Sequence, residues 1–400
     1  MVVSSAYLVT TINIQGFMAL LPLIQKDLTI SLSQAGLYST FYFFSATVVS
    51  IVIGWVVDVF GVRKCLIAGL VSLGLLMIAH AFASFYGLIL VLAFLTGIGF
   101  SIITPSANKA VTDQVSPERR AFFIGLTLAF SGLGGFLGAI AMPVVAVGFG
   151  WRAALFSGGL VALLGSYIVG RFIPPVLKAD SGPGSNGLKR IRGMLADFCS
   201  RLKVLIRNRY LLVVGMVGLI FGLSISGISG HYSLFLSHDL GYNPGYSGLG
   251  LGLFQIGGTI GLPAWGLASD RLLGRNRRIG LMIMAFTTAV SCLFFGFYVS
   301  KDIFSLTFVM FFSFLLGFTV MGIPGVYFTF VCELVAPFYA GAATGLSLIF
   351  IRSGAVLSPY LFGSFADYSG SYSLSWIILG MTVFSLAVFF TVLSAQYISK

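Results

Sequence analysis

The 400-residue chain is far more apolar than a soluble protein of this length. Hydrophobic residues make up 58% of it and charged residues 8%, whereas soluble domains carry roughly 25% charged residues. So few charges cannot cover a water-facing surface, which excludes soluble enzymes, disordered chains and secreted disulfide-rich domains. The net charge of +12 does not indicate nucleic-acid binding, because the Lys and Arg residues cluster between long apolar runs. The composition predicts an all-α polytopic membrane protein.

Twelve apolar segments are long enough to cross a bilayer as helices, since a core of about 30 Å requires about 20 residues. The predicted spans are 4–24, 34–57, 65–83, 87–110, 121–146, 153–174, 210–236, 247–269, 279–299, 304–330, 341–364 and 373–395. No basic region precedes the first span and no small-residue cleavage site follows it. We therefore expect this span to remain in the protein rather than to be removed as a signal peptide.

One connection, at 175–209, is much longer than the others. It contains SGPGSNG at 181–187 and then a basic amphipathic stretch, which is typical of a flexible linker leading to a helix on the membrane surface. We therefore predict an N-terminal six-helix bundle at 1–174, a cytoplasmic linker at 175–209 and a C-terminal six-helix bundle at 210–400.

The basic residues also predict the orientation. If the N-terminus is cytoplasmic, that side holds nearly all of the 23 Lys and Arg residues, and the opposite side holds Lys26, Arg152 and Lys301. Loops rich in Lys and Arg stay in the cytoplasm. We expect an integral protein of the cell (inner) membrane with both termini in the cytoplasm.

The two halves carry similar loops, which indicates an internal duplication. Gly54 and Asp58 recur 212 residues later as Gly266 and Asp270, and Asp113 recurs 220 residues later as Glu333. The complete set of loop residues is Gly54, Asp58, Gly61, Arg63 and Lys64 after the second span, and Gly266, Asp270, Arg271 and Arg275 after the eighth. Glycine allows tight turns and close helix approach, and aspartate accepts charge-assisted hydrogen bonds. We expect a conformational latch; the alternative is a solvated loop whose charges only orient the chain.

The segment G-x-x-x-D-x-x-G-x-R-K at 54–64 resembles the loop signature of the major facilitator superfamily, with a weaker copy after the eighth span. The chain departs from the signature at Val59 and Val62, where basic residues are usual, and Gly274 lies one residue late in the second copy. The resemblance implies two pseudo-symmetric six-helix bundles that rock about a central substrate site. The segments at 108–120 and 150–156 resemble the organic-anion and sugar-phosphate permeases of that superfamily.

Arg352 is the strongest candidate for substrate binding. It lies about 11 residues into the eleventh span, about 16 Å deep at 1.5 Å per residue. No Asp or Glu lies in the middle of a predicted span, so no intramembrane acid is available to pair with it. An intramembrane arginine is costly, and its planar fork suits a carboxylate or a phosphate. The alternative is that Arg352 bonds to backbone carbonyls of a neighbouring helix.

The other candidates are polar side chains at depths that suit a cavity wall. The predicted substrate-binding residues are Lys109, Asn108, Gln15, Asn13, Gln255, Tyr327 and Tyr360, with Tyr38 and Tyr42 as further wall residues. Each could instead make a hydrogen bond between helices, and Lys109 could extend to the lipid headgroups. His231, near the outer end of the seventh span, either titrates near neutral pH or is structural.

We therefore predict a secondary active transporter, not an enzyme, that moves a small organic anion by proton symport or anion exchange. Two alternatives stay open: a proton-coupled exporter of drug-like lipophilic compounds and a non-transporting receptor or scaffold. The fifth span lacks the proline of the drug-exporter signature. The sequence has no nucleotide-binding motif and no metal-ligand spacing, so we expect no cofactor, no metal and no nucleic acid. We expect a monomer in the lipid bilayer. Its partners would be the substrate and either protons or a counter-anion.

Overall fold

The computed structural model describes residues 2–173, 204–207, 209–297 and 305–398, and these ranges contain helices and no strand. The first half consists of α1 (Val2–Leu28), α2 (Leu32–Phe60), α3 (Val62–Ala81), α4 (Tyr86–Gln114) and α5 (Pro117–Phe172). The second half consists of α7 (Arg209–His238), α8 (Pro244–Leu267), α9 (Arg277–Phe297), α10 (Leu306–Val320), α11 (Ile323–Glu333), α12 (Ala340–Ser369) and α13 (Ser373–Ile398). Short turns of π- and 3-10 helix lie at Ala268–Leu272 and Pro337–Tyr339. Most of the predicted linker at 175–209 lies outside the described residues.

The helices confirm the all-α, polytopic class. Within the described residues, ten helical segments are long and apolar enough to cross a membrane. The predicted spans 121–146 and 153–174 both belong to α5, where Gly150 adopts a φ of 84° and separates two helical stretches. The predicted span 304–330 is interrupted, because α10 ends at Val320 and α11 begins at Ile323. The count of twelve spans stays a prediction.

Local sequence signals explain several helix boundaries. Ser31 caps α2 by accepting the backbone N–H of Gln34, while the Gln34 side chain accepts the N–H of Ser31 in return. Asn243 caps α8 in a similar way, by accepting from the third residue after it. Gly61 is the single residue between α2 and α3, and its φ of 81° is a backbone conformation that favours glycine.

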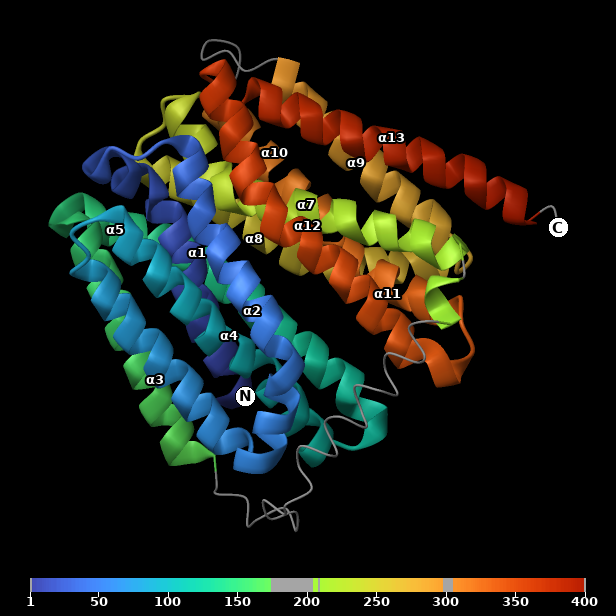
Figure 1. Ribbon diagram of the computed structural model, residues 1–400, viewed down its shortest axis with the longest axis horizontal. Coiled ribbons are helices and arrows are strands. Elements are labelled where there is room, and N and C mark those ends of the chain that lie inside the picture. Colours follow the sequence, from blue (N-terminus) through green and yellow to red (C-terminus); the bar gives the residue numbers. More distant parts are fainter. Residues whose placement is uncertain (1, 174–203, 208, 298–304, 399–400) are drawn as a thin grey trace.

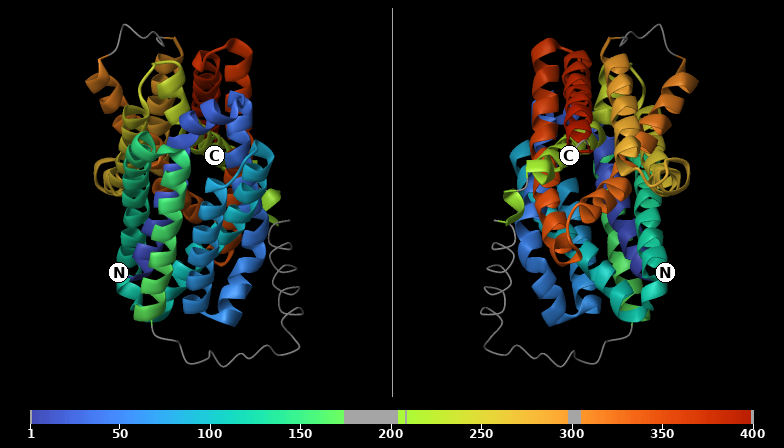
Figure 2. Two further views of the ribbon diagram at one scale, coloured as in Figure 1. Left: turned by 90° about the vertical axis from the view of Figure 1, so that its left-hand side faces the viewer. Right: turned by 90° about the vertical axis from the view of Figure 1, so that its right-hand side faces the viewer.

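The helices pack in two groups (Figures 1 and 2). Helices α1 to α5 form the N-terminal group, in which α5 packs on α1 and α3, and α2 packs on α4. Helices α7 to α13 form the C-terminal group, in which α12 packs on α7, α8 on α10 and α9 on α13. The groups meet mainly through two pairs, α2 with α12 and α5 with α8. These groups follow the predicted halves, although the boundaries at 174 and 210 stay predictions.

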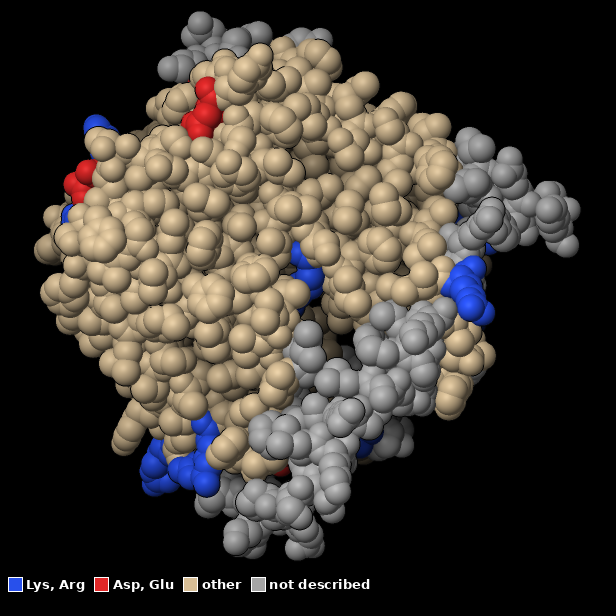
Figure 3. Space-filling view, in the orientation of Figure 1, with Lys and Arg blue, Asp and Glu red and all other residues tan. Residues whose placement is uncertain are grey.

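The two groups touch at one end of the molecule and diverge toward the other. The closed end carries Asp367. There Gly36 of α2 packs against the carbonyl of Pro359 in α12, and Gly363 of α12 packs against the carbonyl of Leu32, so a Cβ at either glycine would overlap the opposite backbone. Toward the end where α1 begins, the ribbons separate (Figure 1) and the surface is hollowed between the groups (Figure 3). We call this the open end.

Candidate functional site

Arg352 lies near the middle of α12 and is half-buried where the two groups face each other. Tyr42 of α2 and Tyr7 of α1, both in the N-terminal group, lie within electrostatic range of it. Among the described residues, no carboxylate forms an ion pair with Arg352. The space-filling view shows basic surface in the hollow between the groups (Figure 3). The guanidinium therefore faces across the interface between the groups without a described counter-charge.

The two tyrosines place hydroxyl groups opposite this arginine. Tyr42 is 1% exposed, and its buried hydroxyl has no hydrogen-bond partner within the described part of the chain. The hydroxyl of Tyr7 lies 2.6 Å from that of Thr104 on α4 and is therefore engaged. A buried polar group without a partner costs about 1–3 kcal/mol, which a hydrogen bond to a ligand would recover. A cation and an unpartnered buried hydroxyl therefore lie within electrostatic range of each other at Arg352 and Tyr42.

From the sequence, Tyr42 was expected only as a wall residue and Tyr7 was not expected at the site. A signal for Tyr7 exists, because Tyr7, Thr11 and Gln15 are spaced by four residues along α1. Residues at that spacing share one face of a helix. A polar row on an otherwise apolar helix indicates the face that turns away from lipid.

Gln15 of α1 and Gln255 of α8 approach each other from the two groups. Both flank Gly135 of α5, where a Cβ would lie 3.2 Å from the Cγ atom of each glutamine. Gln15 Oε1 and Gln255 Nε2 are buried without a hydrogen-bond partner among the described residues. One is an acceptor and the other a donor, so the two amides suit each other or the polar group of a ligand. The structure thus brings these two predicted residues together.

Four other predicted residues have different surroundings. Asn13 is buried and donates to a backbone carbonyl of its own helix at 3.0 Å. Tyr327 is buried in the C-terminal group and donates to the carbonyl of Val214 at 3.1 Å. Asn108 and Tyr360 are exposed. The contact of Tyr327 joins α11 to α7 and matches the alternative interpretation, in which polar side chains hold helices together. Asn13 instead bonds within α1, and its Oδ1 atom has no partner among the described residues.

Lys109 belongs to a charge cluster at the open end of the N-terminal group. Its Nζ atom lies 2.9 Å from Asp58 Oδ1 and 3.7 Å from Asp113 Oδ2. Asp58 lies near the end of α2, and the other two residues lie on α4, so the cluster joins these helices. Lys109 is therefore neutralised by the chain and lies with the predicted latch residues.

A corresponding cluster lies at the open end of the C-terminal group. Arg277, at the start of α9, donates to Asp270 Oδ1 at 2.5 Å, to Glu333 Oε1 at 3.3 Å and to the hydroxyl of Ser269 at 3.0 Å. Asp270 and Glu333 are the acids that the sequence repeat pairs with Asp58 and Asp113. Arg277 was not among the predicted latch residues, although it follows Arg275 by two positions.

The remaining predicted latch residues surround these clusters. Arg63 donates to the carbonyl of Gly170 near the end of α5, which ties the start of α3 to that helix. Lys64, Arg271 and Arg275 are exposed. Gly54 lies within α2, and Gly266 has open space around its Cα atom. Only part of the predicted latch therefore makes contacts between helices within the described residues.

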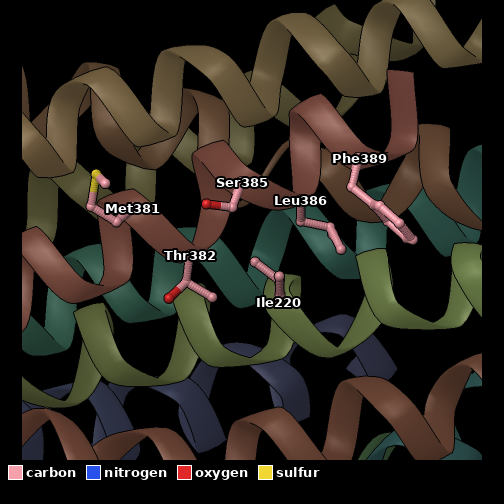
Figure 4. Close-up of a pocket in the computed structure, with 6 residues that line it drawn as sticks. All are labelled: Ile220, Met381, Thr382, Ser385, Leu386 and Phe389. Atoms are coloured by element: carbon pink, nitrogen blue, oxygen red, sulfur yellow. The ribbon is translucent and has the colours of Figure 1, made fainter. Parts of the chain in front are cut away.

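A separate crevice of about 460 Å³ opens between α7 and α13 (Figure 4). It is lined by Ile220, Met381, Thr382, Ser385, Leu386 and Phe389. Neither Arg352 nor its two tyrosines contribute to it. The lining is mainly apolar and contains no charged residue, so this crevice offers no counter-charge for an ionic ligand.

Comparisons with known proteins identify the family to which the chain belongs. Its sequence matches the family model of the Major Facilitator Superfamily over residues 3–359 and 214–398. A hexuronate transporter of Bacillus subtilis is 24% identical over 92% of this chain and 87% of that protein. A probable sulfoacetate transporter of Cupriavidus necator is 26% identical over 90% and 84%, respectively. The membrane sensor protein UhpC of Escherichia coli is 25% identical over 94% and 88%.

A solved structure supports the fold. The bacterial homologue of the human lysosomal transporter Spinster, in an inward-facing and occupied conformation, superposes with a TM-score of 0.79 at 14% identity. The match covers 100% of this chain and 96% of that one. The arrangement of helices described above is therefore similar to that of a membrane transporter along the whole chain.

Proposed function

The chain belongs to the Major Facilitator Superfamily, and on this premise we propose that it is a secondary transporter for a small organic anion. The anion binds between the two helix groups at Arg352. The groups then rock about the bound anion, so that the site opens to one side of the membrane at a time. Proton symport and anion exchange are both compatible with this site.

The observation that carries the proposal is the arginine without a described counter-charge. Placing an arginine at the centre of a bilayer costs at least roughly 2.5–3.5 kcal/mol unless it is hydrated or paired. A carboxylate from outside would accept both branches of the guanidinium, and the free hydroxyl of Tyr42 would donate to the same anion. Two of the relatives are named as transporters of hexuronate and of sulfoacetate, and both compounds are organic anions.

We also propose an orientation. The open end, both termini and the linker lie in the cytoplasm of a cell (inner) membrane, because the loops on that side hold nearly all of the basic residues. Single cysteines at the exposed positions Asn243 and Asn276 test it, since these lie at the closed and open ends. An impermeant maleimide added to intact cells should label position 243 and not position 276. The reverse pattern would contradict the orientation.

The two open-end charge clusters act as the latch in this proposal. Asp58 and its repeat Asp270 each hold a cation that ties helices within one group. Asp58→Asn removes the charge with almost no change in volume, so transport should slow while the affinity for ligand stays unchanged. Asp27→Asn, at the closed end, is the matched control. Transport at the wild-type rate in Asp58→Asn would show that the loop charges only orient the chain.

A panel of carboxylates, phosphates and cationic drugs tests the substrate class. A ligand that binds only the folded protein raises its Tm, by an amount that grows with its concentration relative to Kd. We expect carboxylates to raise the Tm of wild-type protein and not that of Arg352→Ala, with Arg152→Ala as the matched control because Arg152 is paired with Asp27. A response to cationic lipophiles alone would favour the drug-exporter alternative.

A non-transporting sensor is the second candidate, because a membrane sensor protein is among the relatives. A sensor on this fold would bind the same anion without moving it. Flux of the best anionic ligand into liposomes containing the purified protein separates the two. We expect saturable uptake; specific binding without flux would support the sensor.

A further inference from the structure

The closed end is held by a carboxylate of one group on a helix of the other. Asp367 lies in the last turn of α12, and its two oxygens accept the backbone N–H groups of Leu32 and Ser33, each at 2.8 Å. These residues form the first turn of α2. The first N–H groups of a helix have no partner within it and lie at the positive end of its dipole, so a carboxylate is a favourable acceptor there.

The neighbouring contacts hold the same two helices in register. The Thr40 hydroxyl of α2 donates to the carbonyl of Val356 in α12 at 2.8 Å. The buried His231 of α7 donates through Nε2 to the carbonyl of Pro359 at 2.7 Å, because a carbonyl can only accept. Gly36 of α2 packs directly on this pair. The C-terminal group thus fixes the segment of α12 that presents Asp367 to α2.

The pair α2 and α12 carries the same helix ending at opposite ends of the molecule. Helix α2 ends in Asp58-x-x-Gly61 and α12 ends in Asp367-x-x-Gly370, and the two glycines have φ values of 81° and 72°. At the closed end the carboxylate crosses to the other group. At the open end, Asp58 is instead held within its own group by Lys109 at 2.9 Å. The contact between groups is therefore made at the end that is shut.

We propose that Asp367 is a positioning residue of the transport cycle: it keeps the closed end shut by capping α2, and it releases α2 when the site opens on that side. The proposal rests on the proposed transport function for its role in the cycle. The contact itself does not depend on a substrate, since both partners belong to the chain. On release, the carboxylate and the two N–H groups become hydrated at the membrane surface.

Spin labels across the closed end test the proposal without any ligand. Ser84 and Tyr246 are exposed at this end on the N-terminal and C-terminal groups, and cysteines there can be labelled in a chain whose native cysteines are replaced by serine. In lipid nanodiscs we expect the wild-type protein to show mainly the short distance. Asp367→Ala should raise the ratio of long to short distances roughly 2- to 30-fold, the usual effect of losing a helix cap. Asp367→Glu keeps the carboxylate and should restore most of the short population.

Asp27→Ala is the matched control. Asp27 is also an acid of the closed end, but it pairs with Trp151 and Arg152 inside the N-terminal group, so its loss breaks no described contact between groups. We expect its distances to match those of the wild type. An unchanged distribution in folded Asp367→Ala, or an equal shift in Asp27→Ala, would overturn the proposal.

Two further measurements keep the test decisive. If Asp367→Ala fails to fold, Asp367→Asn replaces it, because the amide keeps the volume and one acceptor oxygen and should give a smaller shift of the same sign. No shift in folded Asp367→Asn would overturn the proposal. Arg352→Ala should leave the ligand-free distances unchanged. A failure of anion binding at Arg352 is thereby distinguished from a failure of the closed-end contact.

Discussion

Two arginines of the C-terminal group have opposite electrostatic surroundings. Arg277 is 7% exposed and is bound by two carboxylates and a hydroxyl of its own group. Arg352, at the interface between the groups, faces Tyr42 and Tyr7 and pairs with no described carboxylate. Within the described residues, the chain supplies carboxylates to Arg277 and none to Arg352, and we propose that a ligand anion binds there. The difference shows that the surroundings of an arginine, more than its presence, indicate an anion site.

The two open-end clusters support this interpretation. The acids are repeated in both halves, but the cation comes from α4 as Lys109 in one half and from α9 as Arg277 in the other. The repeat thus keeps a neutralised cluster at each position while the source of the cation changes. Arg352 has no such described partner, which sets it apart from both clusters.

The largest effect should come from Arg352→Ala. Losing a charge-assisted contact should weaken binding of the best carboxylate roughly 10- to 150-fold, about 1.5–3 kcal/mol. The ligand-free Tm should stay near the wild-type value, because no described acid is left unpaired. Calorimetric titration measures the affinity. A large drop in Tm with unchanged affinity would place Arg352 in the same class as Arg277.

Arg277→Ala should give the opposite pattern. It separates Asp270 and Glu333 from their cation, but both are about half-exposed and regain water, so we expect a loss of about 1–2 kcal/mol in stability. Carboxylate affinity should not change. Thermal unfolding and titration on the same sample measure both. A parallel loss of affinity would show that the comparison between the two arginines is wrong.

Tyr42→Phe sharpens the account of the site. The substitution removes only the unpartnered hydroxyl, so the protein should be as stable as wild type or slightly more stable. Carboxylate affinity should fall roughly 2- to 13-fold, the equivalent of one hydrogen bond of about 0.5–1.5 kcal/mol. Tyr38→Phe is a suitable control on the same helix, because Tyr38, which the sequence placed among the wall residues, is buried against Phe17 within the N-terminal group. Equal carboxylate affinities in Tyr42→Phe and Tyr38→Phe would indicate that the Tyr42 hydroxyl does not bind the anion.

Lys109→Gln should have the smallest effect. Its ion pairs are well exposed, with Asp58 at 62% and Asp113 at 53%, and exposed pairs contribute about 0–1 kcal/mol. We expect a change in Tm near the limit of detection and no change in carboxylate affinity. A drop in affinity as large as that of Arg352→Ala would indicate that Lys109 binds the substrate.

The fold was largely predictable because hydrophobic length alone identifies membrane helices. The predicted break between 146 and 153 coincides with the kink at Gly150, where two helical stretches meet within α5. The interruption between Val320 and Ile323 could not be predicted, because the sequence is apolar on both sides of it and the pattern of apolar residues does not change there.

The candidate site was only partly predictable, because its contacts join helices that are far apart in the sequence, and no single segment shows which residues will meet. Arg352 was evident from its depth alone. Asn13 and Gln15 are two residues apart, about 200° around a helix, so only one of them could face the partner group, and the sequence did not say which. Arg277 was missed because its partners lie 7 and 56 residues away. Tyr7 shares one face of α1 with Thr11 and Gln15, but the sequence did not show that this face turns toward Arg352.

The most direct test of the account compares a carboxylate ligand with its uncharged carboxamide, in wild-type protein and in Arg352→Ala. The two ligands have nearly the same shape, so the ratio of their affinities reports recognition of the charge. We expect the wild type to prefer the carboxylate roughly 10-fold or more, and Arg352→Ala to bind both about equally. If the variant keeps the wild-type preference, another group binds the anion, and the central claim that Arg352 provides the counter-charge is contradicted.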